Sequence, residues 1–159
     1  MVATPMKKTS FMIAQFFARI GLTAMEISII VLFAYFYFGI TIQGGFLPFL
    51  TLFLGGNIAF TGIAIFVSSR TSNTQIGNGL INIVVMPMMI LSGIFFSYHN
   101  FPDWAITFIE KMPLTLLADS IRSVFNEGAH LMDILPAFGL LSLVGLFFFT
   151  IGIRIYRWY

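Results

Sequence analysis

The sequence predicts an all-α integral membrane protein, with four transmembrane helices and a re-entrant or interfacial helical hairpin before the last of them. Composition is the first indication, because 58% of the 159 residues are hydrophobic and only 9% are charged, whereas soluble domains average about 25% charged residues. The second is that four apolar stretches come close to the roughly 20 residues that a helix needs to cross a bilayer. The third is a pair of shorter amphipathic stretches between the last two spans.

The chain is expected to form a single transmembrane domain over residues 1–159, since no soluble domain, linker or repeat interrupts it. The four predicted spans cover residues 11–40, 46–67, 79–97 and 134–153. Pro48 and Pro136 fall in the first turns of the second and fourth spans. Proline is tolerated there because the backbone N–H that it lacks would have no partner within the helix.

Small residues recur at helical spacing in the second and fourth spans. They are Gly55, Ala59 and Gly62 in the second, and Gly139, Ser142 and Gly145 in the fourth. Small side chains let two helix backbones approach closely in lipid. We therefore expect packing seams at these positions, either within the chain or between two copies.

The hairpin is predicted over residues 102–126, as two short helices with a break at Met112-Pro113. Proline removes a backbone donor and disfavours helix at the residue before it. Neither half reaches the length needed to span a bilayer. In the second half the apolar side chains share one face and the polar ones the other: Leu117, Ile121, Val124 and Phe125 against Asp119, Arg122, Ser123 and Asn126. Such helices lie in the interface or dip into the membrane while packed on protein.

The distribution of charge predicts the orientation in the membrane. One side of the predicted spans carries only basic residues: Lys7, Lys8, Arg70, Arg154 and Arg157. The other side carries mostly acidic ones: Asp103, Glu110, Asp119, Glu127 and Asp133, with Lys111 and Arg122. The positive-inside rule places both termini in the cytoplasm of a cell (inner or plasma) membrane. An even number of spans agrees with that placement.

A family resemblance appears around the hairpin. An apolar run is followed by Ser-Gly, two phenylalanines, a short polar break, Pro and Trp, and then by Pro-Leu-Thr and Asp-x-x-Arg. The residues that carry this pattern are Ser92, Gly93, Phe95, Phe96, Pro102, Trp104, Pro113, Leu114, Thr115, Asp119 and Arg122. The pattern resembles the C-terminal portion of the permease subunit of type-2 ATP-binding-cassette (ABC) exporters.

The resemblance implies a function and partners. It implies a membrane subunit that forms part of a translocation path, together with a second permease copy or half, and that is driven by separate ABC ATPase subunits. The hairpin would face outwards. The first membrane helix here corresponds to the family's third, so the first two helices of a full permease are expected to be missing from this chain.

The segment Thr4-Pro5-Met6-Lys7-Lys8 precedes the first span and allows two interpretations. By resemblance it contacts the ATPase subunit. From its charge alone it is a basic anchor at the anionic inner leaflet.

Polar residues inside the predicted spans are candidates for a gate or an intramembrane polar site. They are Glu26, Asn57 and Asn82, with Pro87 and Gly93 as positions where the third span can bend. An ionised Glu26 would be costly in lipid, so it either faces a cavity or another subunit, or is neutral and hydrogen-bonded to a neighbouring helix. The amides are expected to bond across helices, and the proline is equally well explained as a static kink.

The sequence offers no catalytic site, and we expect neither a cofactor nor a resident metal. It has no Cys and no Gly-rich phosphate loop with Lys-Ser/Thr, and its net charge of +2 is too small to suggest a nucleic-acid partner. His99 with Asp103 and His130 with Asp133 have a helical spacing that could hold a metal, but an interfacial polar role is the preferred interpretation. The alternatives to an exporter subunit are a non-transporting membrane scaffold and a proton-coupled transporter that uses Glu26.

Overall fold

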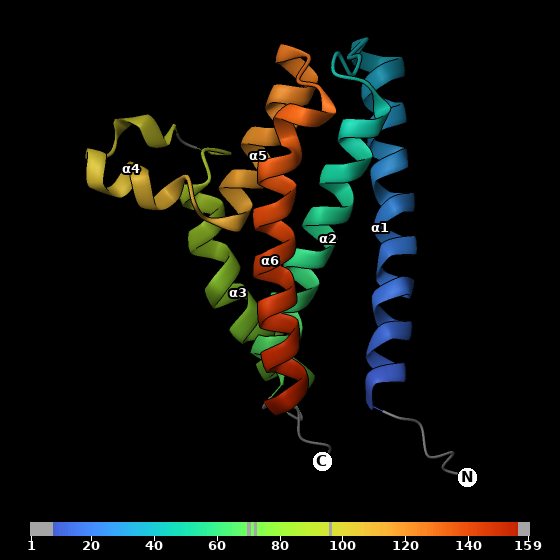
Figure 1. Ribbon diagram of the computed structural model, residues 1–159, viewed down its shortest axis with the longest axis vertical. Coiled ribbons are helices and arrows are strands. Elements are labelled where there is room, and N and C mark those ends of the chain that lie inside the picture. Colours follow the sequence, from blue (N-terminus) through green and yellow to red (C-terminus); the bar gives the residue numbers. More distant parts are fainter. Residues whose placement is uncertain (1–7, 70, 72, 96, 156–159) are drawn as a thin grey trace. The chain divides into compact units, whose positions relative to one another are not determined.

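The computed structural model describes residues 8–69, 71, 73–95 and 97–155, and every regular element in this part of the chain is helical (Figure 1). The helices are α1 (Lys8–Phe38), α2 (Phe46–Ser68), α3 (Thr74–Leu91), η1 (Tyr98–Asn100), α4 (Asp103–Ile109), α5 (Pro113–Arg122), η2 (Ser123–Glu127) and α6 (Leu131–Ile155). Three of the described helices, α1, α2 and α6, are long and apolar enough to cross a membrane. The predicted all-α membrane class is therefore confirmed.

The chain divides into two compact units, residues 1–41 and residues 42–159. In the first unit, α1 is a single helix of 31 residues whose large apolar side chains are exposed around its surface, among them Phe17, Met25, Ile30 and Phe36. A helix that is apolar on all sides is suited to surroundings of lipid or other membrane helices. Glu26 also lies exposed on α1.

The second unit is built on the close packing of α2 against α6. A Cβ atom on Gly62 would collide with the backbone carbonyl of Gly145, and one on Gly145 would collide with the carbonyl of Ile58 and lie 2.7 Å from the Cα of Ala59. The two backbones are therefore in direct contact, which only the missing side chains allow.

The same seam continues along both helices. A Cβ on Gly55 would lie 2.9 Å from the ring of Phe138, and one on Gly152 would lie 3.0 Å from the backbone nitrogen of Phe66. Most of the predicted small residues thus pack within the chain. Gly139 does not, because a Cβ there would meet no atom within 4 Å.

A compact apolar cluster closes one end of this pair of helices. Leu52 of α2, Val124 of η2 and Ile134 of α6 are buried, and partly buried side chains such as Leu117 and Ile121 of α5 pack around them. The second half of the predicted hairpin is thereby fixed to α2 and α6 through the apolar face that its sequence predicts.

Helices α1, α2 and α6 lie within three residues of three predicted spans at each end, whereas α3 begins five residues before the third predicted span and ends six residues before the end of that span. Helix α3 begins at Thr74, where the side chain of Asn73 accepts a hydrogen bond from the backbone N–H of Gln75 at 2.9 Å, so polar residues form its first turn. It ends at Leu91 because Gly93 adopts a left-handed conformation with φ +74°. Hydropathy alone extended the span to residue 97.

The α2–α6 contact gives a first testable prediction with a matched control in the same helix. Gly145→Ala should lower the free energy of unfolding by about 1–3 kcal/mol, because the added methyl group forces the two backbones apart. Gly139→Ala adds the same methyl group where space is open, and should leave stability unchanged or raise it by up to about 1 kcal/mol through helix propensity. Unfolding in mixed micelles measures both, and equal effects of the two variants would contradict the packing described.

Candidate functional site

The candidate site lies where α3 ends and the hairpin begins. Gly93 has a positive φ, and a Cβ atom at this position would lie 2.8 Å from the ring of Tyr98. Glycine is therefore required twice here, for the backbone conformation and for space. Tyr98, the first residue of η1, is only 7% exposed, so its ring closes over the turn.

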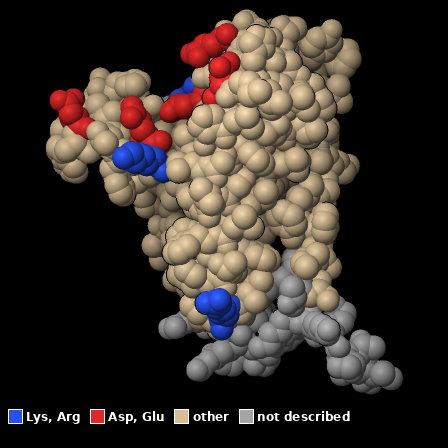
Figure 2. Space-filling view, in the orientation of Figure 1, with Lys and Arg blue, Asp and Glu red and all other residues tan. Residues whose placement is uncertain are grey.

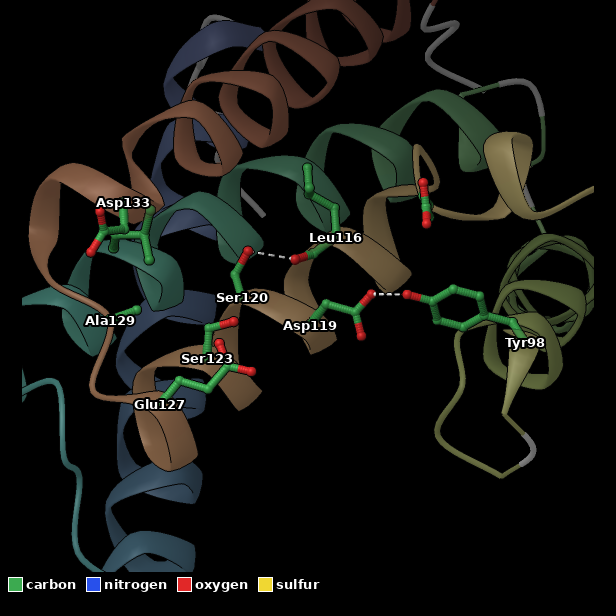
Figure 3. Close-up of a pocket in the computed structure, with 10 residues that line it drawn as sticks. Tyr98, Leu116, Asp119, Ser120, Ser123, Glu127, Ala129 and Asp133 are labelled. Atoms are coloured by element: carbon green, nitrogen blue, oxygen red, sulfur yellow. Dashed lines mark hydrogen bonds between the residues drawn. The ribbon is translucent and has the colours of Figure 1, made fainter. Parts of the chain in front are cut away.

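Four residues form one connected polar network, which we call the Arg122 network: Gly93, Tyr98, Asp119 and Arg122. The Arg122 guanidinium donates from Nη1 to Asp119 Oδ1 at 2.7 Å and from Nη2 to the carbonyl oxygen of Gly93 at 2.6 Å. The Tyr98 hydroxyl donates to the other oxygen of Asp119 at 2.7 Å (Figure 3). The turn of α5 that carries Asp119 and Arg122 is thus tied to two segments that precede the hairpin.

The surroundings of Tyr98 keep its hydroxyl protonated. Burial of the ring, together with the hydrogen bond to Asp119 and the negative charge of that carboxylate, raises the pKa of Tyr98 from 10.0 to about 12. The phenol is therefore a donor at any physiological pH, as the network requires.

The first half of the hairpin, α4, carries its aromatic side chains outwards. Trp104 is 79% exposed and Phe108 is also exposed, while Ile109 at the end of the helix is buried. In Figure 1, α4 extends away from the body of the second unit and runs across the direction of α6. Exposed tryptophan on such a short helix is typical of the membrane–water interface.

The second half begins and ends at defined breaks. Pro113 occupies the first turn of α5, after Met112 in an extended conformation. Thr115 is fully buried, and within the described residues its hydroxyl has no hydrogen-bond partner. After Arg122 the helix widens into a π-helical turn, η2, which ends at Gly128 with φ +70°. Such turns often occur at functional sites.

The π-helical turn is joined to the start of α2. The backbone N–H of Gly44 donates to the carbonyl of Val124 at 2.8 Å, and a Cβ on Gly44 would collide with the carbonyl of Ala129. The turn before α2, η2 and the start of α6 therefore form one closely packed end of the second unit.

An open hollow of about 540 Å³ lies at this end, between the hairpin and the start of α6 (Figure 3). Four carboxylates and three hydroxyls line it, together with three apolar residues: Glu110, Asp119, Glu127 and Asp133; Tyr98, Ser120 and Ser123; Leu116, Ala129 and Ile134. Figure 2 shows the acidic side chains gathered on this part of the surface. The hollow therefore presents a negative potential, which attracts cations and disfavours anions.

Sequence reasoning found only part of this hollow. Asp119 is a predicted site residue, whereas Glu110 and Glu127 serve only to predict orientation, and Asp133 is otherwise considered only with His130. The spacing of Leu116, Ser120, Ser123 and Glu127 along one helix face is the signal that could have found a further part of the lining. Tyr98 approaches Asp119 from 21 residues away, and no local pattern predicts that contact.

In both histidine–aspartate pairs, the histidine makes a contact that supports the local structure. The backbone N–H of His130 donates to the carboxylate of Asp133 at 2.9 Å, so Asp133 caps the start of α6. The ring of His99 packs on that of Tyr98, with centroids 4.5 Å apart. Within the described part of the chain, no group of three or more potential metal ligands comes together.

The remaining predicted site residues are scattered through the two units. The Asn57 side chain donates to the carbonyl of Phe53 in its own helix at 2.9 Å, so this hydrogen bond is local. Asn82 and Pro87 lie exposed along α3, and Glu26 is in the other unit. Thr4, Pro5, Met6 and Lys7 lie outside the described residues, and α1 begins at Lys8.

The raised pKa of Tyr98 predicts how stability depends on alkaline pH. The folded protein holds the phenolic proton more tightly than the unfolded chain, so this stabilisation is complete below pH 10.0 and is lost as the pH rises towards about 12. Tyr98→Phe keeps the ring but removes the proton and the hydrogen bond, at a cost of about 1 kcal/mol. The stability difference between wild type and variant, measured by unfolding in micelles, should be constant up to pH 10 and shrink above it. A difference that does not change above pH 10 would contradict the assignment.

Comparison with known proteins supplies the family. The family described as ABC-2 type transporter (ABC2_membrane) matches residues 1–126. The protein named "ABC transporter G family member 20" from Dictyostelium discoideum is 24% identical over 136 residues, which cover 83% of this chain and 18% of that protein. The chain thus spans less than a fifth of the length of this relative. No solved structure matches it. Because the match extends over most of the sequence, the chain belongs to the ABC-2 type transporter family, whose membrane domain is a permease component of ABC transporters.

Proposed function

We propose that the chain is a permease subunit of an ABC exporter, which forms part of the translocation path and is driven by separate ATPase subunits. The observation that carries this proposal is the family match over residues 1–126. No exported substrate is proposed, because the acidic hollow favours positively charged groups in general and no particular compound.

The hairpin is proposed to enter the membrane from the outer side without crossing it. Helices α4 and α5 have 7 and 10 residues, which at 1.5 Å per residue gives lengths of about 10 and 15 Å. A bilayer core is about 30 Å thick. The exposed Trp104 and the packing of α5 on α2 and α6 support an interfacial first half and a protein-packed second half.

The proposed topology has four spans, with α3 as the third. Helix α3 has 18 residues and is about 27 Å long, which is close to the bilayer core. Helix α6 carries Asp133 in its first turn and Arg154 in its last, so the acidic hollow and a basic residue lie at opposite ends of one span. The positive-inside rule then places both termini in the cytoplasm of the inner or plasma membrane.

The ATPase contact is proposed for the segment Thr4–Lys8. A basic stretch that runs into a helix of 31 residues is suited to carry a displacement from the cytoplasm into the membrane. A second permease copy or half would complete the path. Glu26, Asn57, Asn82, Pro87 and Gly93 are proposed as polar or bending positions along it, and Trp104, Pro113, Leu114 and Thr115 as parts of the outer hairpin.

The topology can be tested with single cysteines, since the chain has none of its own. Asp103→Cys and Asn126→Cys, at the two ends of the hairpin, should both react with an impermeant thiol reagent applied to intact cells. Gln75→Cys, at the opposite end of α3, should react only after permeabilisation. All three positions are exposed in the structure. Labelling at only one end of the hairpin would mean a true crossing, and labelling of Gln75→Cys from outside would reverse the orientation.

The ATPase contact can be tested by reversing charge on either side of the membrane. Lys7→Glu with Lys8→Glu should reduce co-purification of the ATPase about tenfold or more, because two favourable charge contacts become repulsive. Lys111→Glu, in the hairpin, is the matched control and should leave co-purification unchanged.

The outcomes separate the candidate functions. Normal co-purification and export with the reversed Lys7 and Lys8 would remove these lysines from the contact surface. If no ATPase co-purifies with the wild-type protein, the exporter proposal is wrong and a membrane scaffold takes its place. Activity that needs no ATPase and is lost in Glu26→Gln would instead favour proton coupling.

A further inference from the structure

Helix α3 is held differently from the other membrane helices of the second unit. Most of its side chains are exposed, including the large apolar residues Leu80, Ile83, Met86 and Ile90. Gly77, near its inner end, is buried, and a Cβ there would lie 3.4 Å from Thr71 and 3.9 Å from Ser68. Packing thus fixes the end of α3 next to α2, while the middle of the helix has little protein around it. In Figure 1, α3 diverges from α6 towards the C-terminal end of α3.

The outer end of α3 depends on the Arg122 network. The carbonyl of Gly93, which follows the last turn, accepts its hydrogen bond from Arg122 across 29 residues of sequence. Asp119 holds the guanidinium in place through its first oxygen and is itself oriented by Tyr98 through its second. Next to this contact, Ser92 is fully buried.

The contacts of the Arg122 network are partly exposed to water. The side chains of Arg122 and Asp119 are 45% and 36% exposed, so water can replace each of their contacts. The α2–α6 seam, by contrast, brings one backbone directly against the other. Opening at the network would therefore leave the rest of the unit folded.

We propose that the Arg122 network is a releasable latch that fastens the outer end of α3 to the hairpin. When Arg122 leaves the Gly93 carbonyl, α3 pivots about its inner end near Gly77, and Ser92 becomes accessible. Arg122 is then the positioning residue of the latch, and Asp119 and Tyr98 hold it in register. The latch itself does not depend on the proposed function. Only its role in transport, as a movable element on the outer side, rests on that function.

The latch can be tested by the reactivity of a buried reporter in the full chain, reconstituted in lipid nanodiscs. Ser92→Cys should react slowly with a small methanethiosulfonate reagent. Adding Arg122→Gln or Asp119→Asn should accelerate the reaction about tenfold or more, because each removes a charge-assisted contact of the latch. Lys111→Gln removes a hairpin charge outside the network and should not change the rate. Arg122→Lys, which restores the charge without the forked geometry, should give an intermediate rate.

A second reporter distinguishes release of α3 from unfolding of the hairpin. Val124 is fully buried in the cluster that joins η2 to α2 and α6. The rate at which Val124→Cys reacts with the reagent should therefore not change in any of these variants. Equal acceleration at both reporters would mean that the network merely stabilises the hairpin, and would overturn the proposal. An unchanged Ser92→Cys rate in both Arg122→Gln and Asp119→Asn would overturn it as well. If either variant fails to insert, Tyr98→Phe removes one hydrogen bond of the same network and gives the same readout. None of these rates depends on an ATPase, so failure of the latch and failure of the exporter proposal are separate results.

Discussion

The direct contact between the α2 and α6 backbones at Gly62 and Gly145 is the constraint on which the rest of the second unit depends. In lipid, no hydrophobic driving force brings two apolar helices together, so close approach and dense packing must supply the attraction. Glycine on both helices removes the side chains that would hold them apart. The resulting pair provides the fixed frame on which the start of α6 and the hairpin can be positioned.

The hairpin packs against α2 and α6 at only one end of this pair of helices. Val124 and Ile134 fill the space between the ends of the helices, and the backbone of Gly44 bonds to the π-helical turn. Because α5 is shorter than a span, it can pack on the helices without crossing the bilayer. Helix α4 has no such support and presents aromatic side chains instead. One half of the hairpin is therefore part of the core, and the other half is suited to the interface.

Polar groups are concentrated at the end of the unit that carries the hairpin. The acidic hollow and the Arg122 network both lie beside the hairpin, where their side chains are partly exposed. Placing these charges in the middle of a span would cost several kcal/mol for each group. The same exposure that makes the charges tolerable also makes their contacts exchangeable. The closely packed and the water-exposed parts of the unit thus differ in the amount of protein around them.

The sequence by itself determined the helical membrane class, three of the spans and the break at Pro113, because hydropathy, helix length and proline geometry are local properties. The Asp119–Arg122 pair is local as well, since residues three apart face each other on a helix. Only the tertiary structure decided where α3 ends, since the carbonyl of the left-handed Gly93 is bonded by Arg122 from 29 residues away. The hollow was decided in the same way, because its lining comes from η1, the hairpin and the start of α6, which only the tertiary packing brings together.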